Sequence, residues 1–150
     1  MGRTVAAGLG SEETELMQVM ELRACIEPPL AERAATRATE RDIAQLDRII
    51  QDTRGVDSGK EFAILDRSFH LAIVQYTYNP LLVTLLDRVQ ELAEPSRSEK
   101  LLTRSRITSS AREHQAIADA IARRDSAGAF EAAAAHLASI QTRILQEIRK

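Results

Sequence analysis

The sequence has little cysteine, few aromatic residues, no excess of positive charge and no long apolar segment. Cys25 is the only cysteine, which excludes an internal disulfide and a cysteine-rich metal cluster. Two tyrosines, three phenylalanines and a net charge of −2 offer little for stacking bases or attracting phosphates. No apolar run approaches the roughly eighteen residues of a membrane span. We therefore expect a chain that binds neither membranes nor, by itself, nucleic acid.

The length and composition indicate one water-soluble domain. A chain of 150 residues can bury a single core, and its 44% hydrophobic and 28% charged residues are typical of globular proteins. Residues 1–10 lack the apolar segment of a secretory signal, so we expect an N-terminal tail at 1–10, a helical domain at 11–150 and a cytoplasmic location.

Apolar residues recur at helical spacing along the chain, and no segment shows the alternation of a β-strand. Ser11 is predicted to cap the first helix, which is expected to continue, kinked, through Pro28 and Pro29. Thr39 and Asp42 predict a capped start for the second helix. Gly55 to Gly59 marks a loop, Pro95 bends or ends a later helix, and 96–108 gives no clear pattern. The remaining helices are predicted to start at about Lys60, at Asn79-Pro80, at Ser109 or Ser110, and at Asp125-Ser126. These features predict an all-α fold, an antiparallel bundle of six or seven helices.

All three histidines fall among the apolar positions of their own helices. His70 follows Asp66 by four residues, so both side chains leave one face of the third helix. His114 and His136 lie on the apolar faces of the last two helices. An unpaired buried carboxylate is unfavourable, and buried imidazoles need hydrogen-bond partners. A cation would satisfy all four groups, and this oxygen and nitrogen set suits Zn, Ni, Mn or Fe. The alternative is that the histidines are ordinary core hydrogen-bonders and that Asp66 and His70 form a simple ion pair.

Several short motifs in order along the chain resemble one known family. They are Glu21-Leu22-Arg23 with Glu27, Asp66-Arg67-Ser68-Phe69-His70, Asn79-Pro80-Leu81-Leu82, Glu113-His114, Asp125 and His136-Leu137. Together they resemble the FCD domain, the effector-binding module of FadR-type GntR transcription regulators, from about Leu16 to Ile144. The resemblance implies a metal ion held by Asp66, His70, His114 and His136 inside an antiparallel bundle, with Zn or Ni favoured. It also implies a small organic-acid effector and a homodimer.

The resemblance also suggests roles for residues outside this set of four. Arg23 corresponds to an arginine that faces the cavity and pairs with a carboxylate effector, and a salt bridge to Glu27 is an equal alternative. Arg97 and Arg104 are expected on the solvated surface, as is Glu113, for which contact with a metal ligand is the alternative.

The chain departs from the family in the region before its first helix. Ten residues leave no room for the winged helix-turn-helix, so DNA binding is expected only through an N-terminal domain missing from this chain. We expect a ligand-sensing and dimerisation domain and no enzyme. The alternatives are a metal-dependent hydrolase or lyase, for which no companion base is found, and a purely structural dimerisation module.

Overall fold

The computed structural model describes residues 10–150, and over this range the fold consists of α-helices joined by short connections. The predicted tail lies almost entirely outside the described residues. The elements are α2 (Ser11–Arg37), α3 (Glu40–Thr53), α4 (Gly59–Gln75), α5 (Pro80–Leu92), the 3-10 helix η1 (Glu94–Arg97), α6 (Arg104–Ala122) and α7 (Ser126–Ile148). The described range contains no strand, so the predicted all-α bundle of six or seven helices is confirmed. None of these helices is long and apolar enough to cross a membrane.

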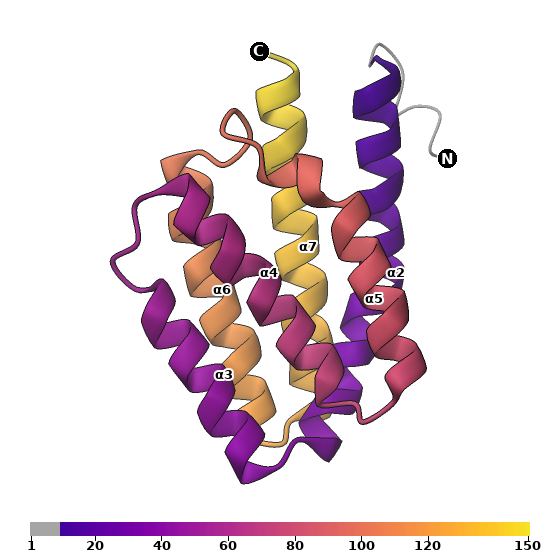
Figure 1. Ribbon diagram of the computed structural model, residues 1–150, viewed down its shortest axis with the longest axis vertical. Coiled ribbons are helices and arrows are strands. Elements are labelled where there is room, and N and C mark those ends of the chain that lie inside the picture. Colours follow the sequence, from indigo (N-terminus) through magenta and orange to yellow (C-terminus); the bar gives the residue numbers. More distant parts are fainter. Residues whose placement is uncertain (1–9) are drawn as a thin grey trace.

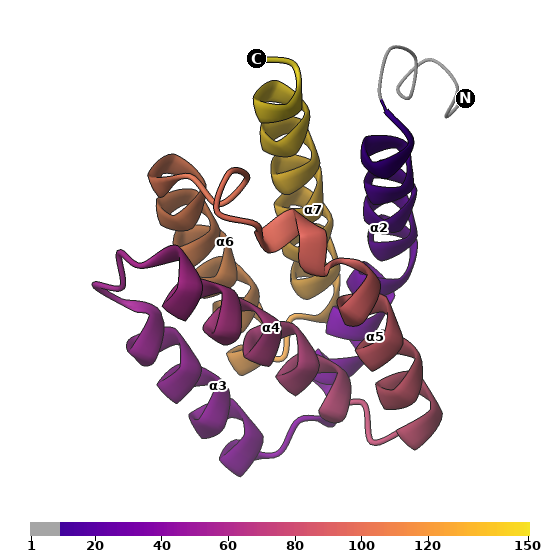
Figure 2. The same ribbon diagram turned by 45° about the horizontal axis from the view of Figure 1, so that its top comes forward.

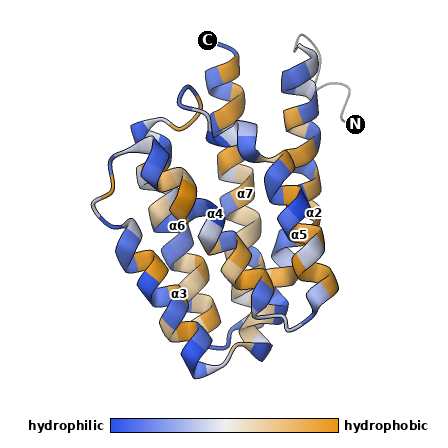
Figure 3. Ribbon diagram, in the orientation of Figure 1, coloured by the Kyte–Doolittle hydropathy of each residue, from blue (hydrophilic) through white to orange (hydrophobic). Residues whose placement is uncertain are grey.

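Helix α7 runs through the middle of the bundle, where it packs against α2 and α6. Figure 1 shows α3 and α6 on one side of it and α2 and α5 on the other, with α4 crossing in front. The view in Figure 2 shows the same arrangement and places the start of α2 and the end of α7 at one end of the molecule. Orange and blue residues alternate along the helices in Figure 3, as expected for amphipathic helices around one core.

Thr39, Asn79 and Asp125 cap their helices as predicted, but Ser11 does not, because α2 begins at Ser11 and its N-cap, Gly10, makes no side-chain hydrogen bond. The Thr39 hydroxyl accepts from the backbone N–H of Asp42, whose carboxylate accepts from that of Thr39, so the capping box is present. Asp125 caps α7 as expected. The predicted start of α6 at Ser109 or Ser110 was wrong, because the helix begins at Arg104. Polar residues fill the inward positions of its first turns, which hid the helical pattern. They are Arg106, Ser109 and Ser110, all buried.

Helix α2 continues through both prolines, as predicted. Pro28 and Pro29 lack N–H groups, so the carbonyls four residues earlier lose their helical hydrogen bonds. Those carbonyls belong to Ala24 and Cys25, which are exposed, so water can take their place. The ribbon of α2 changes direction in its lower half (Figure 2). This change brings the buried residues after the prolines against the core, among them Ala31, Ala34 and Ala35.

Candidate metal centre

Four buried side chains from three helices meet in the middle of the bundle. Asp66 and His70 extend from α4, His114 from α6 and His136 from α7. One potential ligand atom from each of them lies within 4.8 Å of the corresponding atom of every other. The four residues that the spacing and the resemblance singled out are therefore neighbours in space.

The facing atoms of the cluster are one carboxylate oxygen and three Nε2 nitrogens. His114 Nε2 lies 3.2 Å from Asp66 Oδ1 and 3.2 Å from His136 Nε2. His70 Nε2 lies 3.6 Å from Asp66 Oδ1, beyond hydrogen-bonding distance, and it has no partner although it is buried. A buried ring nitrogen without a partner is unfavourable, and so it points to a group that the protein atoms do not supply.

Two glutamates orient the rings from outside the cluster. Glu27 on α2 accepts from His70 Nδ1 at 2.7 Å, and Glu113 on α6 accepts from His136 Nδ1 at 2.7 Å. With a proton held on Nδ1, the Nε2 atom of each neutral ring presents its lone pair to the cluster. Metal-binding histidines in proteins are commonly oriented by a carboxylate in this way.

The expectation that Glu113 lies on the surface was wrong. Its side chain is only 22% exposed, and it accepts hydrogen bonds from the hydroxyls of Ser109 and Ser139, both at 2.8 Å, besides that from His136. Glu113 follows Ser109 by four residues, and Ser139 follows His136 by three. These helical spacings put Ser109 and Glu113 on one face of α6, and His136 and Ser139 on one face of α7. They are the signal that would have placed these four side chains between the two helices.

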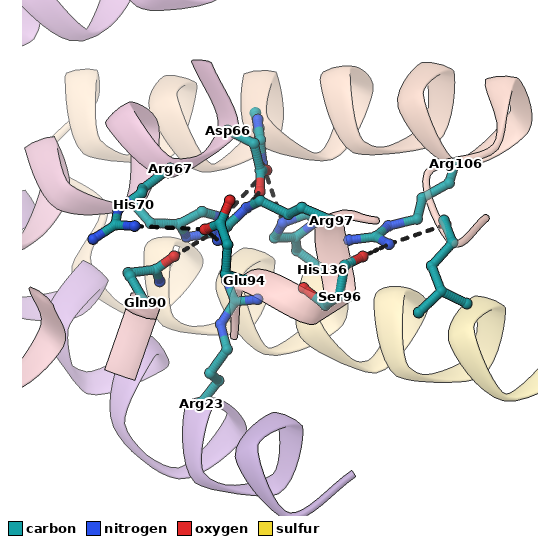
Figure 4. A network of polar contacts seen from close by, with 12 residues as sticks. Arg23, Asp66, Arg67, His70, Gln90, Glu94, Ser96, Arg97, Arg106 and His136 are labelled. Atoms are coloured by element: carbon teal, nitrogen blue, oxygen red, sulfur yellow. Dashed lines mark hydrogen bonds and ion pairs between the residues drawn. The ribbon is translucent and has the colours of Figure 1, made fainter. Parts of the chain in front are cut away.

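Arg97 was also expected on the surface, and this too was wrong. Its side chain is buried, and its Nε donates to Asp66 Oδ2 at 2.7 Å. The guanidinium also donates to Gln90 and to Glu94, so Asp66 faces a fixed cation on one oxygen and the imidazoles on the other (Figure 4). Sequence reasoning missed Arg97 because η1 has no periodic pattern. Arg104, expected on the surface as well, is exposed.

Arg23 is fully buried and forms the salt bridge with Glu27 that the sequence offered as the alternative to contact with an effector. Its Nε lies 2.5 Å from Glu27 Oε2. Glu27 therefore links Arg23 to His70, and Gln90 adds a longer hydrogen bond to the same carboxylate at 3.4 Å. Arg23 is therefore linked to the cluster indirectly, because Glu27 lies between Arg23 and His70.

Burial and neighbouring charges set the protonation of the cluster. Burial opposes ionisation of Asp66, but the Arg97 charge, the hydrogen bond from His114 and the nearby His70 hold its pKa well below the usual range. Burial lowers the pKa of His114 to about 3, and it also lowers the pKa of His136. Burial alone would lower the pKa of His70, but the Glu27 charge raises it instead, with help from Asp66. An ionised carboxylate and two neutral imidazoles are thus ready to bind a cation, which would displace the proton from His70 Nε2.

These observations fit a divalent metal ion. The donor set is one carboxylate and three imidazoles, all buried, and two of the rings are held by carboxylates from behind. The unpartnered His70 Nε2 is accounted for if a cation completes the cluster. Beside His70 and His136 lies a small cavity with a volume of about 10 Å³, counted as space for the centre of a water molecule. Such a space holds about one water.

The fold and this cluster define an all-helical domain with a buried Asp and His centre, and comparison with known proteins gives its class. Residues 18–139 match the FCD domain family. The chain is 32% identical over 130 residues to the galactonate operon transcriptional repressor of Escherichia coli (strain K12), which covers 85% of the chain and 56% of the repressor. It is 28% identical over 147 residues to the HTH-type transcriptional regulator LutR of Bacillus subtilis (strain 168), covering 94% of the chain and 67% of LutR.

Solved structures share the fold. Streptococcus agalactiae GntR superposes with a TM-score of 0.75 at 22% identity, covering 94% of this chain and 64% of that one. The metal-free FCD domain of TM0439 gives 0.75 at 19% identity and covers 95% of this chain and 99% of that domain. The chain belongs to the FCD family, the effector domain of GntR-type transcription regulators. Its homologues are regulators and not enzymes, and the chain spans little more than half the length of the galactonate operon repressor.

Proposed function

We propose that this domain senses a small carboxylate effector through a divalent metal ion bound by Asp66, His70, His114 and His136. The observation that carries the proposal is the set of four buried donor atoms within 4.8 Å of one another, with the tautomers of two rings fixed by glutamates. Zn or Ni suits this donor set best. Four protein ligands leave coordination positions open for an oxygen of the effector.

Arg23 is the proposed partner for the effector carboxylate. A guanidinium forks a carboxylate with two parallel hydrogen bonds, and Arg23 is buried beside the cluster. It is paired with Glu27 at 2.5 Å, so an effector would have to share or replace that partner. The cavity beside His70 and His136 holds only about one water, and so effector binding must rearrange the surrounding side chains or helices. Selection between two such arrangements is what a sensor requires.

In a complete regulator, the change would pass to a DNA-binding domain. We place that domain N-terminal to this one, in agreement with the name of LutR as an HTH-type regulator, and we propose a cytoplasmic homodimer with C2 symmetry. The name of the galactonate operon repressor favours a hydroxylated acid among candidate effectors. DNA binding is then absent from residues 11–150 alone.

Metal analysis followed by a ligand screen tests the proposal. Protein without a histidine tag, purified without chelator, should contain close to one metal ion per chain, and His114→Ala with His136→Ala should contain none. Small carboxylates should then raise the melting temperature of the metal-loaded protein only. Absence of metal would favour a structural dimerisation module, and turnover of a screened acid would favour an enzyme.

A further inference from the structure

Arg106 is a buried cation without a carboxylate partner among the residues that the structure describes. It is 2% exposed, and Arg23 and Arg97 are buried as well. Arg23 lies 2.5 Å from Glu27 and Arg97 lies 2.7 Å from Asp66, but Arg106 forms no ion pair within the described range. A buried charge without an opposite charge is unfavourable, and burial lowers the pKa of Arg106 to about 10.

The hydrogen bonds of Arg106 leave part of its guanidinium unused. Its Nη1 donates to the backbone carbonyls of Ser96 and Leu101, the latter at 3.1 Å. Its Nε is buried and has no partner, and the hydroxyl of Ser96 is also buried without a partner. Two unsatisfied polar groups therefore belong to residues that contact each other, as Figure 4 shows. Because buried polar groups are nearly always paired, this pair indicates a ligand group that hydrogen-bonds to both.

The surroundings connect Arg106 to the metal centre. Ser96 precedes Arg97, whose guanidinium holds Asp66, and the charge of Asp66 acts on Arg106. An open groove with a volume of about 770 Å³ lies between the start of α4 and the η1 region and is lined by Arg97 and Leu102 among others. Leu102 follows the Leu101 carbonyl that Arg106 binds. The groove thus reaches Arg97, the residue that holds Asp66, and the residue next to Leu101.

We propose that Arg106 and the Ser96 hydroxyl bind a second anionic group of the effector, which makes the effector a dicarboxylic acid. One carboxylate, with a neighbouring hydroxyl, binds at the metal, and the distal carboxylate accepts from Arg106 Nε and Ser96 Oγ. The inference rests on the proposed function for the metal end of the ligand. The new element is the second anionic group of the effector, and its effect on binding affinity can be measured separately.

The test compares acids that differ only at the distal group. Metal-loaded protein is titrated calorimetrically with malate and with 2-hydroxybutyrate, in which a methyl group replaces the distal carboxylate. A longer pair, 2-hydroxyglutarate and 2-hydroxyvalerate, covers a second spacing. Within at least one pair the diacid should bind about tenfold more tightly or better, because a hydrogen bond to a charged group contributes that much. Similar affinities within both pairs would overturn the inference, while binding of the monoacids would leave the proposed function standing.

Two variants assign the preference to the residues. Arg106→Gln should lose the diacid preference and keep the monoacid affinity. Ser96→Ala should reduce the preference about threefold to tenfold, and it keeps the backbone carbonyl that Arg106 holds. Arg104→Gln is the matched control, because it removes an exposed arginine from the same helix and should change nothing.

Metal content and melting temperature separate a binding role from a structural one. If Arg106→Gln loses metal or unfolds, Ser96→Ala decides the question, and a full diacid preference in that variant overturns the proposal. If the chain binds no metal, or binds metal and none of the four acids, the proposed function fails and the inference fails with it.

Discussion

The glutamate behind His136 allows the metal proposal to be tested without touching a ligand. Glu113 accepts from His136 Nδ1 at 2.7 Å and from two serine hydroxyls. Although partial burial opposes ionisation, the hydrogen bonds from His136 and the serines lower the pKa of Glu113 to about 2, so it is an anion at neutral pH. Glu113→Gln keeps the shape and an acceptor oxygen but removes the charge. We expect His136 to become a weaker ligand.

The expected magnitude follows from comparable outer carboxylates. Their removal typically weakens metal binding by about 10- to 100-fold. At 25 °C this corresponds to about 1.4 to 2.7 kcal/mol of stability in excess metal. In a domain of this size, that loss lowers the melting temperature by roughly 3 to 10 °C. Without metal, the substitution weakens only hydrogen bonds and should cost about 1 kcal/mol or less.

Chelator competition and thermal melts measure these two quantities. The affinity loss should appear in competition with a chelator of known metal affinity, and the difference in melting temperature from the wild type should be larger with metal than without. Asp119→Asn is the control, because Asp119 is an exposed acid on the same helix, and it should leave the metal affinity unchanged. An unchanged metal affinity in Glu113→Gln, or an equal loss of stability with and without metal, would refute the reasoning.

Four further outcomes follow from the fold and the site. If the free metal concentration is 100 times the dissociation constant, removing the metal with a chelator should lower the free energy of unfolding, measured in urea, by about 2.7 kcal/mol. Burial opposes ionisation of Asp42, but hydrogen bonds from Thr39 and Tyr78 together lower its pKa. Its contribution to stability is therefore present above the unfolded value of 3.8 and is lost as the pH falls below it. Asp42→Asn should therefore destabilise the protein at pH 7, and the difference from the wild type should shrink near pH 3. Phe69→Ala should cost about 3 to 5 kcal/mol in urea unfolding, because the ring is buried and stacks on His114 with 4.1 Å between centroids. Ala34→Leu should cost about 1 to 3 kcal/mol, because Ala34 is 0% exposed in the core and has no room for added carbons.

The sequence predicted the features that local spacing determines. Helical periodicity placed Asp66 and the three histidines on inward faces, and capping residues marked most helix starts. Both signals act within a few residues of the chain, so a single sequence is enough to find them. Convergence of three helices on one point is not a local property, and it was expected mainly through the resemblance to the FCD domain.

The features that the sequence did not predict depend on tertiary contacts of polar residues. Arg97 and Arg106 are buried because their charges meet a carboxylate or backbone carbonyls from other segments. Hydrophobic patterns assign such residues to the surface, since an unpaired arginine would stay there. The same reasoning explains the late start predicted for α6, whose first turns bury Arg106 and two serines in place of apolar residues.

The balance of buried charge explains why effector binding should depend on the metal. Within the described range the buried arginines at positions 23, 97 and 106 are equal in number to the carboxylates around the cluster, at positions 27, 66 and 113, although only Arg23 and Arg97 are paired with one. The charges of these side chains therefore nearly cancel while the histidines are uncharged. A divalent cation shifts that balance by two positive charges, and at low dielectric such an excess strongly favours an arriving anion. A monoacid would offset half of the excess and a diacid all of it. On the proposed function, the metal would supply the attraction for the effector, while the arginines would decide which acid fits.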